Sequence, residues 1–220
     1  MTSPERQKLE NSINELYEVF AKYPLPRWIN CNSHQKNSHI HCLKQITNDD
    51  LWRYYEDCEL FNLSDDVFKS ILPRVFELIA FDDFYSYQFS YNLSISQLGE
   101  SFEWQHWNRD EQASVKRYLI ALWKYVLSEY PSPSMFSDDI AGEISELDDD
   151  MVLYIRILEE HCDSLSGIQH LADMVTGQFT YKLHKQSWVL PLLEKTYYEH
   201  IDTPIGDLMA MAVKAIEQNG

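Results

Sequence analysis

Cysteine and histidine gather in one short polar stretch of this sequence. The residues are Cys31, His34, His39, His41 and Cys42, in the pattern C-x2-H-x4-H-x-H-C. Thiolate sulfur and imidazole nitrogen are the ligands that structural Zn²⁺ prefers at tetrahedral geometry. The spacing differs from that of zinc fingers, in which a longer loop separates two ligand pairs. Two hypotheses follow, a structural zinc site and a surface loop with exposed histidines and buried thiols. No other cofactor is indicated.

Motifs of nucleophilic or hydrolytic catalysis do not occur in the sequence. It contains no G-x-S-x-G elbow, no P-loop and no H-E-x-x-H pattern. One group of residues has the types that a hydrolase site needs: Asp163, Ser164, Ser166, His161 and His170. Proximity along helical segments does not make a catalytic triad, which is defined by geometry in space. We therefore expect a protein that is not an enzyme.

Acidic residues are concentrated in one fifth of the chain. Residues 132–175 contain eleven Asp or Glu and a single basic residue, Arg156, and so carry −10 of the total charge of −17. Such a surface repels itself but steers a basic partner toward it. The candidate contact residues are Asp138, Asp139, Glu143, Glu146, Asp148, Asp149, Asp150, Glu159 and Glu160, with Tyr154 as an aromatic anchor. The alternative is a solvated acidic face without a partner.

The overall composition narrows the class of partner. The 220 residues include 18 Lys or Arg and 35 Asp or Glu, a balance that disfavours direct binding to nucleic acid or to an anionic membrane. The N-terminus lacks the apolar stretch of a signal peptide, and no run approaches the roughly 18 apolar residues of a membrane span. We therefore expect a cytoplasmic protein whose four cysteines are reduced thiols.

Apolar residues recur at helical spacing along almost the whole chain, which predicts an all-α fold. Helix starts are predicted at Ser3-Pro4, Thr47 with Asp50, Ser64, Asn108 with Glu111, Ser137, Asp148, Ser164 and Thr203-Pro204. Pro73 predicts a kink or a restart. We expect nine or ten helices in a single domain over 1–220, arranged as an irregular helical bundle or a short α-solenoid. The loop at 131–137 is a candidate soft boundary.

One stretch resembles the signature of a known protein family. Residues 68–78 read F-K-S-I-L-P-R-V-F-E-L, similar to the F-K-x-x-L-P-R-x-x-E-L signature of a group of small helical bacterial proteins, which we call the LPR-motif family. Residues 50–54 resemble the D-L-x-x-Y helix that precedes this signature in the family. A later part of the family pattern is matched by Trp104, Trp107, Glu111 and Trp123. The resemblance covers roughly residues 47–125 and leaves out the acidic segment.

Proteins that look like this are often encoded beside polymorphic or contact-dependent toxins and act as their immunity proteins. The resemblance therefore implies the C-terminal domain of a cognate toxin as the partner. Nucleases need basic surfaces to bind phosphate, which an acidic inhibitor can cover, so an RNase that cleaves tRNA is the first candidate and a DNase the next. A helical scaffold that binds another basic protein is the alternative. The motif itself has a packing explanation, because Arg74 and Glu77 can pair at i, i+3.

Overall fold

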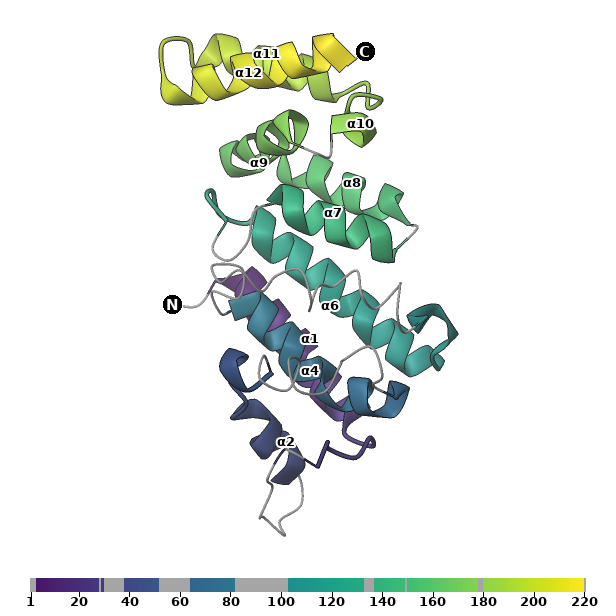
Figure 1. The fold of residues 1–220 in the computed structure, drawn as a ribbon. Coiled ribbons are helices and arrows are strands. Elements are labelled where there is room, and N and C mark those ends of the chain that lie inside the picture. Colours follow the sequence, from purple (N-terminus) through teal and green to yellow (C-terminus); the bar gives the residue numbers. More distant parts are fainter. Residues whose placement is uncertain are drawn as a thin grey trace. The chain divides into compact units, whose positions relative to one another are not determined.

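A computed structural model of the chain describes residues 3–27, 29, 38–51, 64–81, 103–132, 137–148, 150–177 and 180–219. Within these ranges every regular element is a helix, ten α-helices and one short 3₁₀ helix (Figure 1). The predicted all-α class is therefore confirmed. None of the helices in these ranges combines the length and the apolar character needed to cross a membrane.

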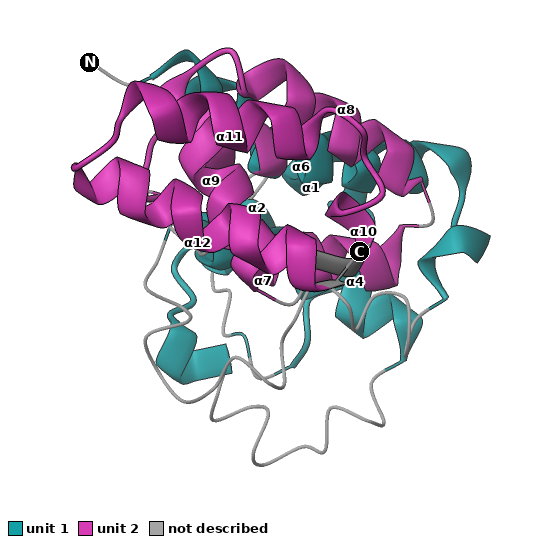
Figure 2. Cartoon of the chain, turned by 90° about the horizontal axis from the view of Figure 1, so that it is seen from above, with its two compact units in different colours: residues 1–122 teal, residues 123–220 magenta. Residues whose placement is uncertain are grey.

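The chain divides into two compact units, Met1–Leu122 and Trp123–Gly220 (Figure 2). The division falls inside helix α6 (Arg109–Leu127), before the loop at 131–137 that the sequence marks as a candidate boundary. Residues of α6 are buried on both sides of this division. Leu122, for example, is fully buried, and the next residue, Trp123, is 2% exposed.

Unit 1 is built around helix α4. It contains α1 (Pro4–Phe20), α2 (Ser38–Lys44), α4 (Asp65–Phe81), the 3₁₀ helix η2 (Trp104–His106) and the first part of α6. Both α1 and α2 pack against α4. The apolar face of α1 is buried as predicted, because its residues recur every three or four positions.

Local capping fixes the starts of several unit 1 helices where the sequence predicts them. The Ser3 hydroxyl accepts a hydrogen bond from the Arg6 amide at the start of α1. Thr47 and Asp50 form the reciprocal pair of a capping box, with amide-to-side-chain distances of 3.0 and 3.2 Å. At Pro73 the helix does not restart, since α4 runs through it as one element. The buried side chains on both sides of this proline hold the helix together.

Unit 2 is built around helix α9. It contains α7 (Ser137–Leu147), α8 (Met151–His161), α9 (Leu165–Thr176), α10 (Thr180–Leu183), α11 (Val189–Glu199) and α12 (Pro204–Asn219). Helices α7, α8, α10 and α12 all contact α9, and α11 packs on α12 (Figure 1). Helix α9 is correspondingly the most enclosed, with Leu171, Ala172, Met174 and Val175 fully buried.

The turn between α8 and α9 is a close-packed corner. The amide and the hydroxyl of Ser164 both donate to the carbonyl oxygen of His161, at 3.0 and 2.8 Å. The same hydroxyl accepts from the Gly167 amide at 3.1 Å and so caps α9. Gly167 lies so close to His161 that a Cβ atom there would stand 2.1 Å from its carbonyl oxygen.

The turn between α11 and α12 repeats this corner with equivalent residues. Thr203 donates to the carbonyl oxygen of His200 through its amide at 3.2 Å and its hydroxyl at 2.7 Å. Its hydroxyl accepts from the Gly206 amide at 3.2 Å, and a Cβ on Gly206 would stand 2.3 Å from the His200 carbonyl oxygen. Both corners share the pattern H-x-D-[ST]-x-x-G. Unit 2 thus contains two helix pairs whose turns share these hydrogen bonds, although the backbone differs at the aspartate, where only Asp202 has a positive φ, of 63°.

Candidate partner-binding surface

The predicted acidic residues of α7 lie on one outward face of that helix. Asp139 and Glu146 are exposed and Glu143 is half-buried, and their spacing of four and three residues places all three on one side. We call these three residues the α7 acidic face. Asp138, just before it, is half-buried and directs its carboxylate toward Gly177.

The predicted acidic residues of α8 also point outward. Glu159 and Glu160 are exposed, and so is Asp163 in the turn that follows the helix. We call these three residues the α8 acidic face. Arg156, one turn earlier, is exposed as well and is the single basic residue of 132–175. Asp150, at the N-cap of α8, is exposed, and Asp149 lies outside the described residues.

Two predicted contact residues are buried, and the prediction is wrong for them. Tyr154 is 1% exposed, and its hydroxyl donates to the Asp148 carboxylate at 2.9 Å. Asp148 is itself only 9% exposed and also accepts from the Asp150 amide at 3.0 Å. Burial and the neighbouring Asp148 raise the pKa of Tyr154. This pair therefore joins the start of α8 to the core and cannot anchor a partner.

Unlike Tyr154, two apolar side chains in and just after α8 are exposed. Val152 is 77% exposed on α8, four residues before Arg156 and seven before Glu159, so it lies on the outward side of the helix. Leu165, which follows Asp163 closely, is 39% exposed. The helical spacing from Val152 to the acidic residues is visible in the sequence and could have identified it.

Two neighbouring carboxylates, Asp138 and Asp139, stand in the first turn of α7. Burial, with a contribution from the neighbouring Asp138, raises the pKa of Asp139. An approaching cation would relieve both the repulsion and the incomplete solvation of this carboxylate.

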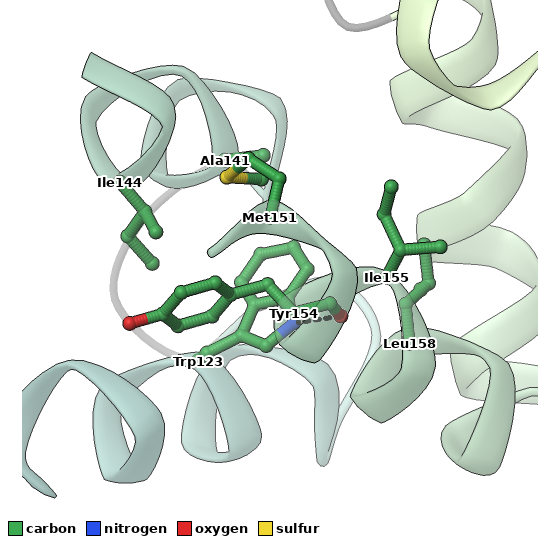
Figure 3. A pocket seen from close by; sticks show the side chains of 7 residues that line it. All are labelled: Trp123, Ala141, Ile144, Met151, Tyr154, Ile155 and Leu158. Atoms are coloured by element: carbon green, nitrogen blue, oxygen red, sulfur yellow. Dashed lines mark hydrogen bonds between the residues drawn. The ribbon is translucent and has the colours of Figure 1, made fainter. Parts of the chain in front are cut away.

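A small pocket lies between α7, α8 and the end of α6 (Figure 3). It is lined by Trp123, Ala141, Ile144, Met151, Tyr154, Ile155 and Leu158. The indole N–H of Trp123 donates to the carbonyl oxygen of Tyr154 at 3.0 Å and closes one wall. The cavity holds about 10 Å³, at the lower limit for one water molecule, and apolar walls offer such a water no partners. It is a small packing void and does not accommodate a substrate.

The described part of the Cys/His stretch does not form a metal site. Cys42 is disulfide-bonded, so its sulfur is not available as a thiolate ligand, and the prediction of reduced thiols is wrong for this residue. The ring of His41 is hydrogen-bonded to Gln45 at 3.1 Å, and Nε2 of His39 is buried without a partner. Among the described residues no three His, Cys, Asp or Glu side chains are placed to hold one ion. Cys31 and His34 lie outside the described residues.

The candidate hydrolase residues bind the backbone and not one another. Ser166 Oγ donates to the Leu127 carbonyl oxygen at 3.4 Å, and His170 Nε2 lies 2.8 Å from the Glu129 carbonyl oxygen. Ser164 and His161 contribute to the corner described above. Cys162 is a free thiol that is buried, and burial followed by the charges of nearby acids raises its pKa to about 12. This thiol stays protonated at neutral pH and is not an activated nucleophile.

Three of the residues that carry the family resemblance, Lys69, Trp107 and Glu111, meet in unit 1. Glu111 is fully buried, and its carboxylate pairs with Lys69 at 3.2 Å and Lys22 at 2.6 Å. The Tyr23 hydroxyl donates to it at 2.5 Å. Burial alone would raise the pKa of Glu111, but these donors outweigh it and lower the value to about 2. The Lys69 ammonium also lies 4.5 Å from the centre of the Trp107 ring.

Arg74 of the same motif has a structural role. Its guanidinium donates to Glu77 at 2.8 Å, which is the i, i+3 ion pair expected from the sequence. It also donates to the Ile46 carbonyl oxygen at 2.7 Å and thereby ties α4 to the segment after α2. Glu77 accepts in turn from the Tyr17 hydroxyl of α1 at 2.6 Å. The LPR-motif residues are therefore used for packing three elements together.

Comparisons with protein-family models, with curated proteins and with solved structures found no match for this chain.

Proposed function

We propose that this chain is an immunity protein that binds and neutralises a cognate bacterial toxin domain. The target is a nuclease, with a tRNA-cleaving RNase as the first candidate. The observation that carries the proposal is the pair of outward acidic faces on α7 and α8, in a segment that contains one basic residue. The resemblance of residues 47–125 to the LPR-motif family supports it independently of the charge.

Charge complementarity gives the physical reason. A nuclease must present Lys and Arg to the phosphates of its substrate, and a row of carboxylates can occupy the same positions. Long-range attraction accelerates the encounter, while buried apolar contacts supply most of the affinity. On this surface Val152 and Leu165 provide such contacts, since both are exposed beside the α8 acidic face.

The first experiment is co-purification with the C-terminal domain of the protein encoded by the gene immediately upstream, tested as the toxin. We expect a complex that weakens with added salt, loss of the nuclease activity in the complex, and protection of cells that express the toxin domain. If no complex forms and such cells are not protected, the immunity proposal is wrong.

Charge-neutralising variants then identify the contact face. We compare D139N/E143Q/E146Q on α7 and E159Q/E160Q/D163N on α8 with the control E194Q/E199Q/E217Q, whose three residues are exposed on α11 and α12. We expect one or both acidic-face variants to reduce the association rate by about tenfold or more and to flatten its salt dependence. The control should retain the wild-type rate. If all three variants reduced the association rate equally, the rate would depend on the net charge of the protein and not on a particular face.

A helical scaffold for another basic protein is the second candidate. The repeated corner of α8–α9 and α11–α12 favours it, because stacked helix pairs of one type build extended binding surfaces in repeat proteins. The two candidates differ in one result. A scaffold binds its partner without abolishing a toxic activity, whereas an immunity protein restores growth.

The proposal places the protein in the cytoplasm, where a nuclease finds its substrate. The disulfide at Cys42 is the observation that opposes this, since cytosolic thiols are normally kept reduced. Alkylation of freshly lysed cells followed by mass spectrometry shows whether Cys42 is a reduced thiol or part of a disulfide in the cell. An alkylated Cys42 supports the cytoplasmic location, and a disulfide-linked Cys42 contradicts it.

A further inference from the structure

His170 is a titratable side chain enclosed in unit 2. It lies on α9 and is 1% exposed. Its Nε2 is 2.8 Å from the carbonyl oxygen of Glu129, and because a carbonyl only accepts, Nε2 carries the proton of the neutral ring. The other ring nitrogen, Nδ1, is buried and has no hydrogen-bond partner.

Three side chains of α9 hold the end of α6 and the segment that follows it. We call residues 128–132 the exit turn. Ser166 donates to the carbonyl oxygen of Leu127 just before it, at 3.4 Å. His170 donates to Glu129, and Asp173 accepts from the hydroxyl of Tyr130. These α9 residues follow one another at i, i+4 and i+7, so they form one stripe along the helix.

The ring of Tyr130 closes the site over the imidazole. The two rings meet edge to face, with centroids 5.1 Å apart. A second proton on His170 would have to sit on Nδ1, where it meets no acceptor. The resulting cation would be enclosed without a hydrogen bond on its new N–H, which is unfavourable in a buried site. Release of the exit turn would admit water to this nitrogen.

The charged groups around His170 only partly offset this cost. Burial lowers the pKa of His170, and the charge of His161 in α8 lowers this pKa further. The hydrogen bond to Glu129 and the negative charge of Asp173 raise it. Burial also raises the pKa of Asp173, with a contribution from Asp138 of α7. Asp173 therefore gives up its negative charge more readily than an exposed carboxylate as the pH falls.

We propose that His170 is an acid-sensitive latch that holds the exit turn against α9 when neutral and releases it when protonated. In the closed form, in which the exit turn packs against α9, the pKa of His170 is lower than the ordinary histidine value of 6.5. The neutral ring therefore stabilises the closed form at pH values above 6.5. The stabilisation is lost progressively as the pH falls below 6.5.

Amide hydrogen exchange of Ser128, whose amide donates to the Tyr125 carbonyl oxygen at 3.2 Å, tests the latch when it is measured in the full chain between pH 7.5 and 5. After correction for intrinsic exchange, we expect protection to fall by up to about tenfold per pH unit below 6.5, the limit for one proton. H170Q keeps a donor for the Glu129 carbonyl oxygen and cannot be protonated, so its protection should not change with pH. H106Q, which alters a highly exposed histidine, should behave like the wild type.

Protection that is independent of pH in the wild type, or equally dependent in H170Q, would overturn the latch. The NMR titration of the His170 ring in the wild-type protein serves as the second measurement, in case H170Q does not fold. We expect a midpoint below 6.5. A midpoint at or above 6.5 would show that the protonated ring is tolerated in the closed form and would also overturn the proposal.

Discussion

Replacing Gly167 by alanine should destabilise unit 2, because the added methyl group would overlap the backbone of His161. The Cβ would stand 2.1 Å from the carbonyl oxygen and 2.4 Å from the carbonyl carbon, about 1 Å closer than real contacts allow. Both atoms belong to the backbone, and so no flexible side chain can move aside. The chain must instead shift at the corner, where the hydroxyl of Ser164 caps the Gly167 amide at 3.1 Å.

The expected cost follows from three contributions. Overpacking of a close contact costs about 1–3 kcal/mol, and a weakened cap adds about 1 kcal/mol. Alanine offsets about 1 kcal/mol of this loss because it forms helices better than glycine. We therefore expect G167A to lose about 1–3 kcal/mol of unfolding free energy. G206A should behave alike, since a Cβ there would stand 2.3 Å from the His200 carbonyl oxygen.

Urea unfolding followed by circular dichroism measures this cost, and Gly142 provides the matched control. Gly142 lies inside α7, and a Cβ on it would meet no atom within 4 Å. G142A should therefore gain about 0.5–1 kcal/mol from helix propensity alone. The reasoning would be refuted if G167A were as stable as the wild type, or if G142A lost as much as G167A.

Further predictions concern three buried polar groups, Glu111, Tyr118 and Cys162. E111Q should lose about 3–5 kcal/mol of stability, because it leaves Lys69 poorly paired at 10% side-chain exposure; an unchanged denaturation midpoint would contradict this. The pKa of the Glu111 carboxylate is lowered from 4.5 to about 2, so above pH 4.5 its ionisation contributes roughly 3 kcal/mol to the free energy of unfolding, and this contribution is lost as the pH falls toward 2. The free energy of unfolding of E111Q should therefore fall less steeply with decreasing pH than that of the wild type. Y118F should cost about 1 kcal/mol, since the Tyr118 hydroxyl donates to the Phe76 carbonyl oxygen at 2.9 Å in the core; calorimetry measures the loss. Cys162 should react with a thiol reagent at pH 8 only after unfolding, because burial raises its pKa to about 12, and rapid labelling of the native protein would contradict this.

The sequence alone determined the fold class and several helix starts. A cap is a contact between residues two or three positions apart, so Ser3, Thr47 and Asn108 carry it wherever the helix is placed. Helical spacing likewise predicted the buried face of α1. The corner pattern H-x-D-[ST]-x-x-G also occurs twice in the sequence, but its meaning became visible only when both copies showed the same hydrogen bonds.

Only the tertiary structure decided which polar side chains face inward. Asp148 and Asp150 are two residues apart and alike in sequence, yet Asp148 is buried against the Tyr154 hydroxyl while Asp150 is exposed. Glu111 was expected to cap α6, but it pairs with Lys22 and Lys69, which come from distant parts of the chain. Burial depends on which helices pack over a residue, and that packing is set by contacts far apart in sequence. Caps and periodicity are local and could be predicted, whereas the exposed acidic faces of α7 and α8 required the fold.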